Sequence, residues 1–115
     1  MENLNQLELA IFESLSIDYP SIKIHVPLLK VLSREITGVG MYVNFADYAL
    51  PNDTPTIESN YGVISTNENI EIEELELGLG YEVNLTNGKI MFIEMVTYGE
   101  EEWSGYIGDF KLTKQ

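Results

Sequence analysis

The strongest constraint on the fold is an Asn-Gly pair between two runs of apolar residues. Tyr81, Val83 and Leu85 alternate with polar residues before Asn87-Gly88, and a largely apolar run over residues 89–96 follows. Asn-Gly readily takes the positive φ angles of a two-residue turn, and alternation puts every second side chain of a strand on one face. The sequence therefore predicts an antiparallel β-hairpin over residues 81–96 as the central feature of a sheet.

A helix is predicted near the N-terminus. Its apolar residues recur at helical spacing, namely Leu4, Leu7, Ile11, Phe12 and Leu15. Asn3 and Gln6 have the spacing of a capping box. A second, short element is predicted before Pro27, which limits any regular structure there to a short piece. Ile22, Ile24 and Val26 alternate as in a strand, whereas Ile22, Val26 and Leu29 share a helical face, and we favour a short helix.

The rest of the chain is predicted to form strands and turns. Residues 31–45 are rich in β-branched and apolar types, and Gly38 and Gly40 are interpreted as a bulge or a close backbone approach within one strand. Residues 46–60 have loop chemistry, and further extended segments are expected at 61–65, 70–77 and 106–112. We expect a single α+β domain over residues 1–115, with an antiparallel sheet of about four to six strands and the N-terminal helix or helices packed on one face.

The charge balance narrows the range of partners. The chain has 19 Asp and Glu residues, 6 Lys and Arg residues and a formal net charge of -13. Such a field repels phosphate backbones and anionic lipid and speeds encounter with basic partners. We therefore expect no direct nucleic-acid partner and no membrane partner. The alternative is that acidity serves solubility alone.

The expected compartment is the cytoplasm. The chain has no cysteine, so disulfides and thiolate metal sites are excluded. Its first residues are acidic where a signal peptide needs positive charge, and no stretch approaches the roughly 20 apolar residues that cross a bilayer.

No catalytic, metal or cofactor site is predicted, so the chain is expected not to be an enzyme. His25 is the one imidazole, which excludes a multi-histidine metal site within one chain, and we interpret it as a partly exposed histidine without a catalytic role. A glycosidase needs a pair of carboxylates, and in this chain Glu94 and Glu100 would be the pair to test. Because Glu94 interrupts an apolar run, we expect it to lie on the solvent face or to bond a partner such as Arg34.

One group of residues is a candidate interface with a basic protein. Aromatic anchors surrounded by carboxylates suit such an interface, since the rings anchor and the carboxylates steer. The candidate residues are Glu68, Glu71, Glu73, Glu74, Glu76, Tyr98, Glu100, Glu101, Glu102, Trp103 and Tyr106. The alternative is a solvated acidic surface on which Trp103 covers the core.

Two segments resemble a known family. Residues 34–42 are similar to an R-E-x-T-G-x-G-aromatic strand, and residues 80–100 are similar to a hairpin that ends in an E-x-x-T-Y-G-E-like sequence. Both resemble small, acidic bacterial proteins of the immunity type, encoded beside contact-dependent or other polymorphic toxins. Met95 departs from the pattern, which places glycine there. The resemblance carries no catalytic residues and implies a partner that is a cognate toxin, such as a basic nuclease.

Three hypotheses follow. The first is an immunity or antitoxin-type protein that neutralises a toxin domain, which both the resemblance and the charge favour. The second is a small-molecule-binding or hydrolytic domain with a polar cleft around Glu94 and Arg34. The third is a subunit of a larger assembly. A convergent polar pocket would favour the second hypothesis, and a flat acidic aromatic face would favour the first.

Overall fold

The predicted hairpin lies at the centre of the sheet in the computed structural model, which describes residues 1–114. Strands β5 (Leu79–Thr86) and β6 (Lys89–Thr97) pair antiparallel from Leu79 opposite Thr97 to Thr86 opposite Lys89. The turn residues Asn87 and Gly88 have φ angles of 53° and 74°. Positive φ at both positions defines the hairpin turn that Asn-Gly favours, so this prediction is confirmed.

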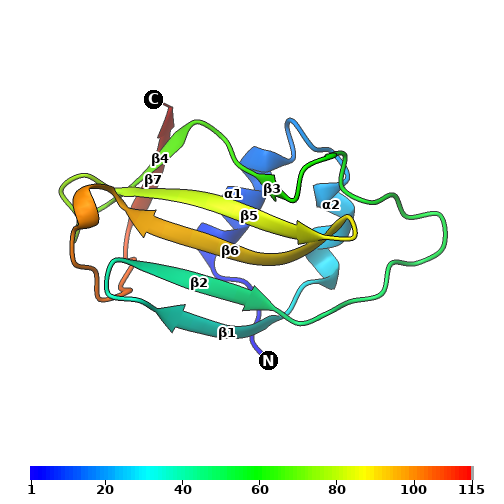
Figure 1. The fold of residues 1–115 in the computed structure, drawn as a ribbon, viewed down its shortest axis with the longest axis horizontal. Coiled ribbons are helices and arrows are strands. Elements are labelled where there is room, and N and C mark those ends of the chain that lie inside the picture. The colour runs from blue at the N-terminus through cyan, green and yellow to red at the C-terminus, as the bar shows by residue number, and fades with distance from the viewer. Residues whose placement is uncertain (115) are drawn as a thin grey trace.

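Seven strands of residues 1–114 form one antiparallel sheet in the order β1-β2-β6-β5-β4-β7, with β3 also paired to β5 (Figure 1). The other strands are β1 (Val31–Ile36), β2 (Gly40–Phe45), β3 (Val63–Ile64), β4 (Glu68–Ile72) and β7 (Phe110–Lys114). The α+β class is confirmed. The sheet has seven strands, more than the four to six that were expected.

The main reason for the difference is that residues 31–45 form two strands instead of one. The chain reverses between β1 and β2, where the Thr37 amide donates to the Gly40 carbonyl at 3.0 Å. Gly38 has a φ of 93°, so it is a turn residue and not a bulge. Gly40 is the expected close backbone approach, because a Cβ there would lie 2.2 Å from the Met95 carbonyl oxygen.

Both predicted helices are present. The N-cap of helix α1 (Gln6–Leu15) lies two residues later than expected, since the capping box joins Asn5 and Glu8 instead of Asn3 and Gln6. Helix α2 (Ile22–His25) runs into a 3₁₀ turn, η1 (Val26–Leu28), that accommodates Pro27. No helix within residues 1–114 is long and apolar enough to span a membrane.

The helices pack on one face of the sheet and lie behind it in Figure 1. The buried side of α1 supplies Leu7, Ile11, Phe12 and Leu15 to the core. The sheet meets it with Met41, Val43, Tyr81, Val83, Ile93 and Met95, which occupy alternate positions on β2, β5 and β6. Strand β7 passes behind β5 and β6 on the same side. The helices therefore cover one face of β1, β2, β6 and β5 and leave the other uncovered.

A buried ion pair fixes α1 to the edge of the sheet. The Glu8 side chain is fully buried, and its carboxylate accepts from Arg34 Nε and Nη2, both at 2.8 Å, and from the Asn5 amide at 2.9 Å. Arg34 also donates to Glu2 at 2.7 Å. The hydrogen bonds that Arg34 donates to Glu8 raise the pKa of Arg34 above its ordinary value, so the guanidinium stays charged.

Replacing Arg34 with alanine should destabilise the fold by about 3–5 kcal/mol, because Glu8 would be left buried without its counter-ion. Lys30→Ala is the matched control, since it removes an exposed Lys30 to Asn3 hydrogen bond and should cost under about 1 kcal/mol. Urea unfolding of both variants measures the difference. An Arg34→Ala variant as stable as Lys30→Ala would contradict this role of the pair.

Candidate functional site

The side chains of the uncovered face stand in three rows that cross the strands. The first row contains Glu35, Tyr42, Glu94 and Glu82, on β1, β2, β6 and β5 in turn. The second contains Ser33, Asn44, Phe92, Asn84 and Val63. The third contains Gly40, Val96 and Gly80. We call these three rows the open face.

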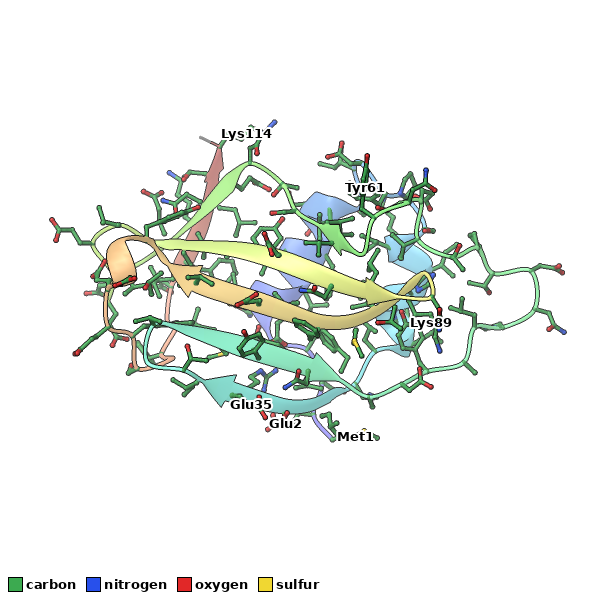
Figure 2. All side chains as sticks on the ribbon, in the orientation of Figure 1. Met1, Glu2, Glu35, Tyr61, Lys89 and Lys114 are labelled. Carbon is green, nitrogen blue, oxygen red and sulfur yellow. The ribbon has the colours of Figure 1, made fainter. Side chains whose placement is uncertain are left out.

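The open face carries glutamates and aromatic rings and no basic residue in its rows. Tyr42 and Phe92 have ring centroids 5.8 Å apart at an interplanar angle of 65°. The Tyr42 hydroxyl donates to Glu94 Oε2 at 2.9 Å, and this hydrogen bond raises the pKa of Tyr42. Figure 2 shows Glu35 on β1 and, away from the middle of the face, Lys89 beside the hairpin turn and Lys114 near the C-terminus.

A hollow of about 340 Å³ lies where the open face meets β4 and the segment after β6. Its walls are formed by Ser65, Thr66, Glu68, Gly80, Tyr81, Glu82, Glu94, Val96, Thr97 and Tyr98. Tyr98 lies close against Gly80, since a Cβ on that glycine would be 2.9 Å from the Tyr98 hydroxyl oxygen. The glycine thus makes room for the aromatic ring at the rim of the face.

The structure brings the two acidic segments of the predicted interface together at one end of the sheet. Glu74 accepts from the Ser104 hydroxyl at 2.9 Å. Glu101 accepts from the amides of Glu76 and Leu77 at 2.8 Å and 3.1 Å. Glu74 and Glu101 therefore tie the loop before β5 to the segment after β6, and their carboxylates serve the fold.

The acidic residues of β4 lie opposite basic residues of the neighbouring strand β7. Glu68 is paired with Lys114, and Glu71 is paired with Lys111. Glu68 is also hydrogen bonded to the hydroxyls of Ser14 and Thr66. Apart from Glu71 and Glu74, which are exposed as well, the exposed residues of the predicted interface are Glu73, Glu76, Tyr98, Glu100, Glu102 and Tyr106. We call these six residues the acidic end; they adjoin the open face through Tyr98, at the left of Figure 1.

Trp103, expected as an exposed anchor, is a core residue with 3% of its surface exposed. Its indole Nε1 donates to the Tyr106 carbonyl at 2.9 Å, and its amide donates to the Gly38 carbonyl at 2.8 Å. The bond to Gly38 fastens the segment after β6 to the β1–β2 turn, and the bond to Tyr106 holds the indole within its own segment. The alternative interpretation, in which Trp103 covers the core, describes this residue correctly.

Arg34 and Glu94, expected as possible partners, lie on opposite faces of the sheet. Arg34 is paired with Val43 in the row that faces α1, whereas Glu94 is paired with Tyr42 on the open face. Glu100 is exposed in η2 (Tyr98–Glu100) with a φ of 56°. The structure thus joins Arg34 to Glu8 and gives Glu94 a tyrosine partner instead.

His25 is fully buried, which corrects the expectation of a partly exposed histidine. Its Nδ1 lies 2.9 Å from the Tyr48 hydroxyl and its Nε2 lies 2.8 Å from the Pro55 carbonyl. The ring thereby holds the loop between β2 and β3 against α2. Among residues 1–114 no group of three or more His, Cys, Asp or Glu side chains is placed to hold a metal ion.

Sequence reasoning missed most of the open face. Glu35, Tyr42, Glu82 and Phe92 were not singled out, although Tyr42, Glu82 and Phe92 each sit at an alternating position beside a buried neighbour. That alternation is the signal that could have found them, because it marks the solvent face of an antiparallel strand.

Trp103→Ala should destabilise the protein by about 3–5 kcal/mol through the cavity it leaves in the core. Tyr106→Ala is the control, because it removes an exposed ring and keeps the backbone carbonyl that bonds Trp103; it should change stability by no more than about 0.5 kcal/mol. Thermal and denaturant unfolding measure both variants. Equal stability of the two would show that the indole is not part of the core.

Comparisons with known proteins returned no match: no family model fits the sequence, and no curated protein and no solved structure is significantly similar to the chain.

Proposed function

We propose that this chain is a binding protein of the immunity or antitoxin type, which neutralises a basic toxin domain by covering it with the open face and the adjoining acidic end. The observation that carries the proposal is the composition of the open face. Three glutamates and two aromatic rings stand in its rows, and no lysine or arginine does. Charge complementarity then favours a basic partner surface.

The physical role of each residue type supports this proposal. Tyr42 and Phe92 are partly exposed rings held in contact with each other, so a partner can bury them with little loss of side-chain freedom. Val63 and Val96 are 43% and 45% exposed and add apolar area around them. The glutamates of the first row and of the acidic end attract a cationic partner from a distance.

The second hypothesis, a hydrolytic or small-molecule domain, has less support. It required a polar cleft shared by Arg34 and Glu94, and these side chains lie on opposite faces of the sheet. A binding protein needs no such convergence, since it can neutralise a toxin by blocking access to the toxin's active site. The proposed setting is the bacterial cytoplasm, with a cognate toxin domain as the partner.

The test is co-expression with a candidate toxin domain, taken from a reading frame beside the one that encodes this chain. The proposal predicts that the chain restores growth and forms a stable complex whose association slows as salt rises. Unchanged toxicity together with the absence of a complex would contradict it. So would an association rate that is equal at low and high salt.

Phe92→Ala should weaken that complex by about 2 kcal/mol or more, mainly through faster dissociation, because the ring is placed as an anchor on the open face. Leu9→Ala is the matched control, since Leu9 is an apolar residue of α1 that is 46% exposed on the opposite side. Surface plasmon resonance on folded variants measures both rates. If Leu9→Ala weakened binding and Phe92→Ala did not, the helix side would be the interface.

A further inference from the structure

We infer that the hollow beside Tyr98 receives an arginine side chain of the protein partner. The inference rests on the proposed function, because it names the group on a basic partner that the open face would recognise. The hollow lies at the corner of the open face next to the acidic end, since Glu82, Glu94 and Tyr98 all line it, so a partner that covers both must pass over it.

The walls of the hollow have the charge that a cation requires. Glu68, Glu82 and Glu94 line it, and no lysine or arginine does. Its volume of about 340 Å³ lies at the lower end of the ~300–1,000 Å³ range of ligand pockets, which suits one long side chain. Tyr98 adds an aromatic wall, and a guanidinium packs well against such a ring.

Two of these carboxylates are placed so that their charges repel each other, which destabilises the fold. Glu82 and Glu94 are directly opposite each other on β5 and β6. Like charges at such positions are destabilising, and the Glu82 side chain has no hydrogen bond or ion pair with any group of residues 1–114. A cation between them would turn this repulsion into two attractions. The opposed glutamates therefore indicate a cationic ligand, and this argument does not depend on the shape of the hollow.

The walls are held in place before a ligand arrives. Tyr42 orients Glu94 through its 2.9 Å hydrogen bond, and Thr66 donates to Glu68 at 2.9 Å. The Thr66 hydroxyl also lies 2.6 Å from the Tyr81 hydroxyl. Burial raises the pKa of Tyr81 to about 12, so this hydroxyl stays protonated. Fixed carboxylates lose little freedom on binding, which strengthens a charged contact.

The spacing of the carboxylates selects an organic cation over a metal ion. Within residues 1–114 no three acidic side chains converge closely enough to hold a metal. The planar guanidinium presents five donors in a fork and can reach more than one carboxylate, whereas an ammonium is a compact point charge. Arginine is thus the side chain that fits the hollow.

The experiment titrates the isotope-labelled full chain with three blocked tripeptides, in which glycine flanks arginine, lysine or the neutral isostere citrulline. The arginine peptide should shift the amide signals of residues 80–82 and 94–98 and bind at least tenfold more tightly than the citrulline peptide. Glu82→Gln should weaken arginine binding at least threefold. The same variant should raise the melting temperature by about 1–4 °C, because it removes the like-charge repulsion.

Asp53→Asn is the matched control, since it removes one carboxylate charge at an exposed loop position outside the open face, the acidic end and the hollow, and asparagine tolerates its φ of 66°. It should leave arginine binding within twofold of the unsubstituted chain. Equal weakening by Asp53→Asn and Glu82→Gln, or shifts spread evenly over the acidic surface, would overturn the inference and show general attraction only. Equal binding of the arginine and citrulline peptides would also overturn it.

Measurements on the complex with the toxin domain distinguish a failure of this inference from a failure of the proposed function. If the complex forms and Glu82→Gln dissociates no faster than Asp53→Asn, the hollow is not the receptor, and the proposed function stands. If no complex forms with any toxin domain, the proposed function fails. The peptide titration then still decides whether the hollow binds a guanidinium.

Discussion

The contact between Glu8 and Arg34 determines which side of the sheet the helices occupy. A fully buried carboxylate is costly unless it is paired and hydrogen bonded, and Glu8 meets this need with Arg34 on β1 and with the amide that begins its own helix. Arg34 occupies the row of β1 that faces α1. The pair therefore docks the capped end of α1 on that face, and the opposite face remains for other contacts.

Strand alternation then decides what the open face presents. On β6, Ile93 and Met95 point to the core, so Phe92, Glu94 and Val96 must point away from it. The same alternation on β2 and β5 places Tyr42 on one side of Glu94 and Glu82 on the other. An antiparallel sheet commonly leaves one face to solvent, but solvent alone does not explain aromatic rings and opposed glutamates at its centre. The basic partner proposed above would account for both.

Local patterns in the sequence predicted the elements better than they predicted the contacts. The Asn87-Gly88 hairpin and the two helices follow from turn chemistry and periodicity over a few residues. The burial of Trp103 could not be foreseen in the same way, because it depends on a backbone bond to Gly38 that is distant in sequence. The sequence suggested Glu94 as a partner of Arg34, and only the register of β1 with β2 shows that Glu8 lies on its side and Glu94 does not.

The central claim is that the partner sits on the open face, and methyl cross-saturation in the complex with the toxin domain tests it most directly. Val63 and Val96 belong to the open face, whereas the exposed methyl groups of Leu9 and Ile24 lie on α1 and α2. The account predicts that irradiating the partner attenuates the signals of Val63 and Val96 and leaves those of Leu9 and Ile24 unchanged. Attenuation of Leu9 and Ile24 with unchanged Val63 and Val96 would contradict it.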